Sequence, residues 1–164
     1  MADPFEALRR RDVPIAPRTE FADELRARLV PKETAVEHGT VTPYLCVDGA
    51  ERAIEWYREQ LDARVVFEPM VMDDGRVGHA EIAIGGSVLM LSDEFTEIGV
   101  RAPTTLGGTP VSLAVTVTDA DATFAAAVAA GATAERPVAD QPHGVRSGWL
   151  IDPFGHRWNV QTPI

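Results

Sequence analysis

The sequence predicts an α+β fold made of two tandem modules, each with the order strand, helix and three strands. Three observations lead to this prediction. Residues 42–54 and 112–124, which lie 70 positions apart, repeat one pattern of apolar and polar residues. Both copies run from a strand-like segment directly into a helix-like segment. Apolar segments of strand length then follow each copy, and residues that favour turns separate them.

The repeat supports the first strand and the helix of each module. Four pairs of residues occupy equal places in the two copies: Leu45 with Val115, Val47 with Val117, Ala50 with Ala120, and Ile54 with Phe124. Each helix is expected to begin with an N-cap residue that is followed three positions later by an acid, because this pairing satisfies free backbone N–H groups and stabilises the positive helix end. The pairs are Asp48 with Glu51 and Thr118 with Asp121.

Helical spacing predicts which side chains the helices bury. In the first helix these are Ile54, Tyr57 and Leu61, and in the second they are Phe124 and Val128. The remaining strands are expected at residues 63–72, 77–84, 87–92, 132–139, 145–151 and 156–161.

The turn between the third and fourth strands fixes a register. Gly85 and Gly86 are expected to form a two-residue hairpin turn, which pairs Ile84 with Ser87. Counting outward places Glu81 opposite Met90 and His79 opposite Ser92. Because directly paired residues lie on one side of a sheet, these four side chains should share a face. A slip of one residue would turn all of them over.

The repeat also divides the chain. Residues 1–38 lie outside it and form an N-terminal extension, in which Phe21, Leu25 and Leu29 predict one amphipathic helix. Residues 39–164 form the repeated domain. Within this domain we expect module 1 at about 40–94, a linker at 95–110 and module 2 at about 111–164.

Composition limits the possible partners and the compartment. The formal net charge of −10 argues against nucleic acid and anionic membranes, because both require a basic surface. No apolar run approaches the roughly 18 residues of a membrane span, and the first residues lack the apolar core of a signal peptide. The single Cys46 cannot form an internal disulfide. These features predict a cytoplasmic protein.

Three strings of residues carry a family resemblance. TPYLCVDG (42–49), GHAEIAIGGSVLMLSDE (78–94) and DPFGHRW (152–158), in this order and spacing, resemble the vicinal-oxygen-chelate superfamily of glyoxalase I, bleomycin-resistance proteins and extradiol dioxygenases. The resemblance covers about residues 40–163. It implies a curved mixed sheet around a ligand cavity, with the helices on the convex side, and it implies a homodimer.

Alternation along the strands sorts side chains toward that cavity. Leu45 and Val47 should meet the first helix, so Thr42, Tyr44 and Cys46 should face the cavity. The expected ligand-binding residues are Thr42, Tyr44, Met90, Ser92, Ser112, Thr116, Arg157 and Asn159, with His79 and Glu81 as candidate catalytic residues. The same alternation would also fit a sheet face that simply meets solvent.

The resemblance also implies positions for a metal site. Metal-dependent members place four His, Gln or Glu ligands on these strands, and the corresponding positions here are Thr42, Met90, Ser112 and Asn159. Two hydroxyls, a thioether and an amide are poor ligands for divalent metals. We therefore expect no metal and no other cofactor. Asn159 should hydrogen-bond a ligand instead, although it could also cap a sheet edge or meet water.

The predicted function follows from this site. A metal-free protein of the glyoxalase/bleomycin-resistance type would bind or sequester a small organic metabolite or antibiotic. The alternative is an enzyme of this fold, an isomerase, lyase or glyoxalase-like protein, that uses His79 and Glu81 as an acid–base pair or holds a metal in another geometry. A purely structural pairing of His79 with Glu81 is also open. Trp158 should pack beneath the helices, His156 should be solvated, and His38 has no expected role.

Overall fold

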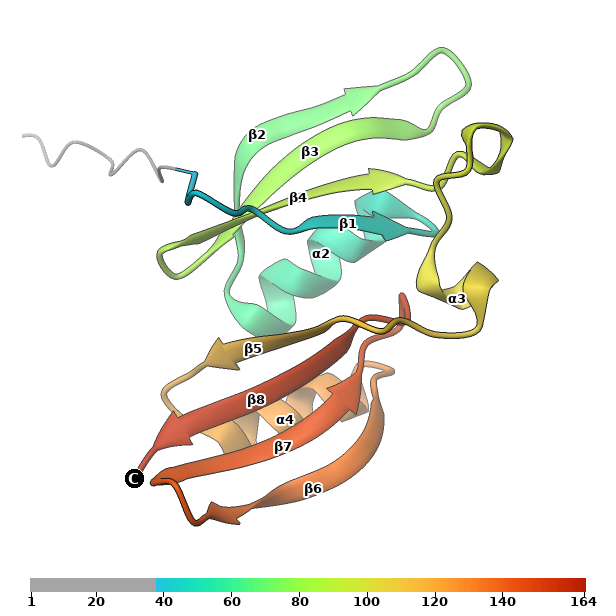
Figure 1. The fold of residues 1–164 in the computed structure, drawn as a ribbon. Helices are drawn as coiled ribbons and strands as arrows, with labels where there is room; N and C mark the ends of the chain where they lie inside the picture. Colours follow the sequence, from blue (N-terminus) through green and yellow to red (C-terminus); the bar gives the residue numbers. More distant parts are fainter. Residues whose placement is uncertain (1–37) are drawn as a thin grey trace, which may run out of the picture. The chain divides into compact units, whose positions relative to one another are not determined.

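The computed structural model describes residues 38–164 (Figure 1). The helix predicted around Phe21, Leu25 and Leu29 lies outside the described residues. Within residues 38–164 the order of strand, helix and three strands occurs twice, as predicted. A short 3-10 helix, η2 (Thr96–Ile98), and a short α-helix, α3 (Pro103–Leu106), connect the two modules.

The first module contains β1 (Tyr44–Val47), α2 (Ala50–Leu61), β2 (Arg64–Val71), β3 (Val77–Ile84) and β4 (Ser87–Asp93). Its strands form a sheet in the order β1-β4-β3-β2, in which β1 runs parallel to β4 and the other pairs are antiparallel. The predicted hairpin register is confirmed, since Ile84 pairs with Ser87 and Glu81 pairs with Met90.

The second module contains β5 (Ser112–Thr116), α4 (Ala120–Ala129), β6 (Thr133–Gln141), β7 (Val145–Ile151) and β8 (Arg157–Pro163). Its sheet has the equivalent order β5-β8-β7-β6. Each helix packs against the strands of its own module (Figure 1). The predicted α+β fold is therefore confirmed, with the mixed sheet formed as two four-stranded halves.

The predicted start of α2 is wrong. Its N-cap is Gly49, with a positive φ of 95°, and no side-chain cap comes from Asp48. Instead, Asp93 at the end of β4 accepts hydrogen bonds through Oδ1 from the backbone N–H groups of Gly49 (2.9 Å) and Ala50 (2.7 Å). Its Oδ2 accepts from the N–H of Val77 at 2.7 Å. Because β1 and β4 are parallel and end together, a carboxylate distant in sequence reaches the helix start.

The second helix begins one residue later than predicted. Asp119, not Thr118, is the N-cap of α4, and its Oδ1 accepts from the N–H of Ala122 at 3.0 Å.

The expected burial of helix side chains holds only in part. Val128 is 36% exposed, and the buried residues of this alanine-rich helix are Ala120 and Ala127. The expected burial of the α2 residues Ile54, Tyr57 and Leu61 is confirmed, and these side chains are 0–6% exposed.

A buried carboxylate joins the two modules. Asp152, in the turn before β8, accepts hydrogen bonds through Oδ2 from Tyr57 Oη (2.7 Å) and Trp158 Nε1 (2.8 Å). Its Oδ1 accepts from the N–H groups of Phe154 and His156, both at 2.9 Å. Trp158 is 3% exposed beside the Tyr57 ring, so its predicted burial is confirmed. The DPFG turn thus holds a helix of the other module as well as reversing the chain.

The prediction that His156 is solvated is wrong. This side chain is 8% exposed, and its Nε2 lies 3.1 Å from the carbonyl oxygen of Cys46 in β1. Burial lowers the pKa of His156, and it outweighs the opposing effects of the Asp152 charge and the Cys46 carbonyl. A neutral imidazole therefore forms a second link between the modules.

Candidate ligand site on the first module

The candidate site lies on the face of the first sheet that points away from α2. Tyr44 and Glu81 both pair with Met90, and His79 pairs with Met70, so these side chains share one face. The intervening residues, including Leu45, Ala80, Ile82 and Leu91, are buried in the core. Ser92, which pairs with Cys46, belongs to the same face and is 5% exposed.

Four side chains on this face form a chain of hydrogen bonds. Tyr44 Oη lies 2.9 Å from His79 Nδ1, and His79 Nε2 lies 3.2 Å from Glu81 Oε1. The other carboxylate oxygen, Oε2, lies 2.9 Å from His38 Nε2. The Glu81 side chain is 13% exposed and the His79 side chain is 25% exposed. This arrangement aligns a phenol, an imidazole and a carboxylate.

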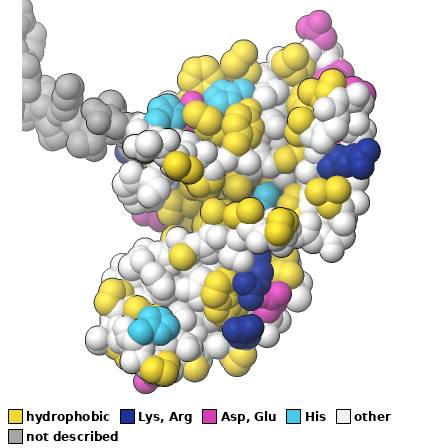
Figure 2. Space-filling view, in the orientation of Figure 1, with side chains coloured by type: hydrophobic (Ala, Val, Ile, Leu, Met, Phe, Trp, Pro, Cys, Tyr) yellow, Lys and Arg dark blue, Asp and Glu magenta, His cyan; other side chains and the backbone are white. Residues whose placement is uncertain are grey.

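An open pocket of about 620 Å³ lies over Tyr44 and His79. Its apolar wall comes from β2 and from the segment after β4, and the lining residues are Tyr44, Cys46, Met70, Met72, Gly78, His79, Ser92, Phe95, Ile98 and Val100. All lining residues within the described part of the chain fall between positions 44 and 100. Figure 2 shows apolar side chains gathered around histidine side chains on this module.

Acidic side chains lie near the pocket wall at Cys46. Burial raises the pKa of the Cys46 thiol to about 11, and the charges of Glu94 and Asp93 contribute to the rise. At the rim, the Arg76 guanidinium stacks on the Phe95 ring at 4.0 Å. Hydrogen bonds to Glu97 and Asp74 raise the pKa of Arg76, so acids already compensate its charge. Cys46 is accordingly a neutral wall residue.

Sequence reasoning missed part of this pocket and part of the hydrogen-bond network beside it. His38 had no expected role, and residues 95–100 were expected only to link the modules. His38 lies 43 positions before Glu81, and no local pattern connects them. Phe95, Ile98 and Val100 did carry a signal, because three large apolar residues in a short linker need a surface to cover.

The expected residues of the second module hydrogen-bond chiefly to protein groups. Arg157 stacks on the Trp149 ring at 3.9 Å and donates through Nη1 to Ser112 Oγ at 3.0 Å. Asn159 is 8% exposed, and its Nδ2 donates to the carbonyl oxygen of Gly148 at 3.3 Å. Thr116 accepts from the Gln161 amide at 3.2 Å.

The structure thus separates the expected site residues into two groups. Tyr44, His79, Glu81, Met90 and Ser92 come together on the first sheet. Thr42 precedes β1, is partly buried, and donates at 3.4 Å to the carbonyl oxygen of Gly39. The role of each residue in binding or catalysis stays a prediction.

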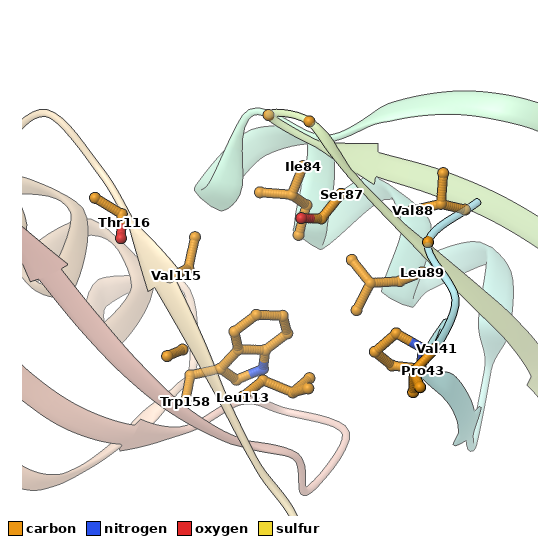
Figure 3. Close-up of a pocket in the computed structure, with 14 residues that line it drawn as sticks. Val41, Pro43, Ile84, Ser87, Val88, Leu89, Leu113, Val115, Thr116 and Trp158 are labelled. Atoms are coloured by element: carbon orange, nitrogen blue, oxygen red, sulfur yellow. The ribbon is translucent and has the colours of Figure 1, made fainter. Parts of the chain in front are cut away.

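A second groove of about 600 Å³ lies between the modules (Figure 3). Val41, Pro43 and Leu89 form one wall, and Leu113, Val115 and Trp158 form the other (Figure 3). Within residues 38–164, its lining contains no acidic, basic, histidine or cysteine side chain. The first-module pocket is therefore the better candidate, because it combines an apolar wall with directional polar groups.

Comparison with known proteins identifies the family. A family model described as the glyoxalase/bleomycin resistance protein/dioxygenase superfamily matches residues 35–160. The chain belongs to this superfamily. Uncharacterized proteins of Mycobacterium bovis and Mycobacterium tuberculosis are 42% identical to it over 127 residues, which span 76% of this chain and 83% and 74% of those proteins.

Solved structures of the superfamily fold are also similar. TioX from Micromonospora sp. ML1 has a TM-score of 0.58 and 25% identity, with 77% of this chain and 97% of that chain covered. The fosfomycin resistance protein FosX from Listeria monocytogenes has a TM-score of 0.57 and 13% identity, with 78% and 95% covered. A Bacillus cereus PhnB protein, described as a putative 3-demethylubiquinone-9 3-methyltransferase, has a TM-score of 0.60 and 24% identity, with 76% and 99% covered.

The side chains at the positions where the resemblance leads us to expect metal ligands do not fit a divalent ion. A guanidinium group donates to the Ser112 hydroxyl, so a cation already lies at this position. The Asn159 amide nitrogen donates to a backbone carbonyl, and Met90 offers only a thioether. Among residues 38–164, no three His, Cys, Asp or Glu side chains are grouped to hold a metal. No helix in this range is long and apolar enough to cross a membrane.

Proposed function

We propose that this protein binds a small organic molecule, a metabolite or an antibiotic, in the first-module pocket without using a metal ion. The observation that carries the proposal is the Tyr44–His79–Glu81 network beside an otherwise apolar pocket of about 620 Å³. Small-molecule sites usually have this composition, because apolar walls supply affinity and a few polar groups fix orientation. Met70 and Met72 suit such a wall, since methionine adapts to different shapes.

Sequestration is the simplest activity for this site. An apolar ligand gains roughly 25 cal/mol for each Å² of surface removed from water, and this gain requires no chemistry. The superfamily includes both binding proteins and enzymes. We also propose that the protein acts as a homodimer.

Ligand binding can be tested with a pair of matched variants. Ile98 and Leu106 are both exposed aliphatic residues after β4, but only Ile98 lines the pocket. A library of metabolites and antibiotics is screened by thermal shift, and each ligand found is titrated by calorimetry. Ile98→Ala should weaken binding about fivefold, because part of the apolar contact is lost, and Leu106→Ala should leave it unchanged. Equal affinities for both variants and for His79→Ala would contradict the proposed site.

A second candidate function is acid–base catalysis in the same pocket. Glu81 hydrogen-bonds to one nitrogen of His79 while the other faces the Tyr44 hydroxyl, which is the geometry of an oriented catalytic imidazole. If the ligand is turned over, His79→Ala should abolish turnover. A ligand recovered unchanged after prolonged incubation with the wild type would count against this candidate and leave binding in place.

A further inference from the structure

We infer that the pocket takes apolar molecules that carry a hydroxyl or amine donor and no negative charge, and that Tyr44 Oη accepts the hydrogen bond from that donor. This inference rests on the proposed function and adds the chemical class of the ligand. It follows from the direction in which each hydrogen bond of the Tyr44–His79–Glu81–His38 chain must run.

Glu81 fixes the first direction. Its Oε1 lies 3.2 Å from His79 Nε2 and its Oε2 lies 2.9 Å from His38 Nε2. An ionised carboxylate only accepts hydrogen bonds. Both imidazole nitrogens that face Glu81 must therefore carry a proton.

His79 fixes the second direction. With a proton on Nε2, a neutral imidazole has a bare Nδ1, which accepts. The Tyr44 hydroxyl, 2.9 Å away, must then donate its proton to Nδ1. No proton of Tyr44 is left for a ligand, whereas the lone pairs of Oη remain available. The Tyr44 side chain lines the pocket, and the residue is 53% exposed.

Protonation of His79 would reverse this bond but would not remove the acceptor. The imidazolium would donate from Nδ1 to Tyr44 Oη. The hydroxyl proton would then turn to the carbonyl oxygen of Gly78, which lies 3.4 Å from Oη. Oη has two lone pairs, and the imidazolium uses only one of them. In both charge states Oη therefore keeps a lone pair that can accept from a ligand donor.

Charge excludes anions from the same position. Glu81 belongs to the network itself, and the charges of Glu94 and Asp93 act on Cys46 in the pocket wall. Arg76 at the rim is already paired with Asp74 and Glu97. A carboxylate ligand would be repelled and would also bring no proton for Tyr44. A hydroxyl or an ammonium group carries no negative charge and supplies a proton to Tyr44 Oη.

Four naphthalene derivatives test this selectivity. 2-Naphthol carries a neutral donor, 2-(aminomethyl)naphthalene carries a cationic donor, 2-methoxynaphthalene has the same body without a donor, and 2-naphthoate is an anion. Each is titrated into the full-length protein at pH 7.5 and followed by fluorescence. We expect the naphthol and the amine to bind at least tenfold more tightly than the methyl ether, and the naphthoate to bind most weakly.

Tyr44→Phe assigns the preference to one oxygen atom. This variant should bring the affinity for 2-naphthol down to that for 2-methoxynaphthalene and leave the methyl ether unaffected, with an unchanged melting temperature. A preference for 2-naphthol that survives Tyr44→Phe would overturn the inference. Equal binding of all four compounds, weakened by Ile98→Ala, would also overturn it but would leave the proposed function in place. Absence of binding by all four would count against both.

Discussion

Tyr57 and Asp152, which lie 95 positions apart, share a buried hydrogen bond of 2.7 Å between the two modules. The Tyr57 side chain is fully buried. Burial raises the pKa of its hydroxyl, and the charge of Asp152 and the hydrogen bond to it raise this pKa further. The proton therefore stays on Tyr57, and the tyrosine always acts as the donor. The stability of the domain should depend on this contact.

Removing the Tyr57 hydroxyl should destabilise the protein. Tyr57→Phe takes one donor from a buried carboxylate, and hydrogen bonds to charged groups contribute about 1.5–3 kcal/mol. We expect a loss of about this size in the free energy of unfolding, measured by urea denaturation. Tyr44→Phe is the matched control and should cost less than about 0.5 kcal/mol, because Tyr44 is 53% exposed. Equal losses of unfolding free energy in the two variants would show that the hydrogen bond to Asp152 does not stabilise the fold more than an exposed hydroxyl does.

Asp93→Ala should also be strongly destabilising. This change leaves the N–H groups of Gly49, Ala50 and Val77 without their acceptor, and an unsatisfied buried group costs about 1–3 kcal/mol. Asp48→Ala is the control, because local sequence nominates Asp48 as the cap but its side chain does not serve as one. Thermal and urea denaturation should separate the two variants by at least about 1 kcal/mol. A larger loss for Asp48→Ala would contradict the cap described above.

His156 should make the fold sensitive to mild acid. Its pKa is lowered in the folded state, so below the ordinary value of 6.5 the unfolded chain binds a proton that the folded chain does not. Stability is therefore fully present above pH 6.5 and falls as the pH decreases below it. Urea denaturation between pH 7.5 and 5.5 should show this decrease.

A neutral replacement tests the origin of that decrease. His156→Gln should flatten the dependence of unfolding free energy on pH over the same range, even if its stability at pH 7.5 is lower. His143→Gln is the control, because His143 is exposed in the turn between β6 and β7 and should leave the slope as it is. If His156→Gln keeps the same slope of unfolding free energy against pH, the acid sensitivity arises from other groups.

Cys46 should react slowly with alkylating reagents. A thiol pKa of about 11, compared with an ordinary value of 9.0, lowers the thiolate fraction at neutral pH on the order of 100-fold. The iodoacetamide reaction of the folded protein should be slower by about this factor than that of the urea-unfolded chain. Its rate should continue to rise with pH up to about 11. A plateau near pH 9 would show an ordinary thiol.

Much of the fold could be predicted because its signals are local. The alternation of the strands, the two-glycine turn and the repeat of residues 42–54 at 112–124 each act over a few positions. The turn alone was sufficient to place Glu81 opposite Met90, and the structure confirms that pairing. The chemistry-bearing residues of the first sheet could therefore be assigned to one face.

The remaining features depend on contacts between distant residues. The caps of α2 and the hydrogen bond from His38 to Glu81 join positions more than 40 apart, and no periodic pattern records them. His156 was misplaced because a histidine beside a turn is usually solvated, whereas here the other module covers it. The network of Arg157, Ser112 and Trp149 was not expected either, because alternation gives the face of a residue but not its neighbours.

Within the described part of the chain, the residues that line the first-module pocket fall between positions 44 and 100, while the buried Asp152 cluster ties the second module to α2. The proposed binding surface and the contacts that hold the two modules together therefore use different sets of side chains. A mutational library restricted to Met70, Met72, Phe95, Ile98 and Val100 would change the proposed binding surface with little disturbance of the Asp152 cluster. The scaffold is in this sense open to re-engineering, because the proposed binding surface can be varied while the buried contacts between the modules are kept.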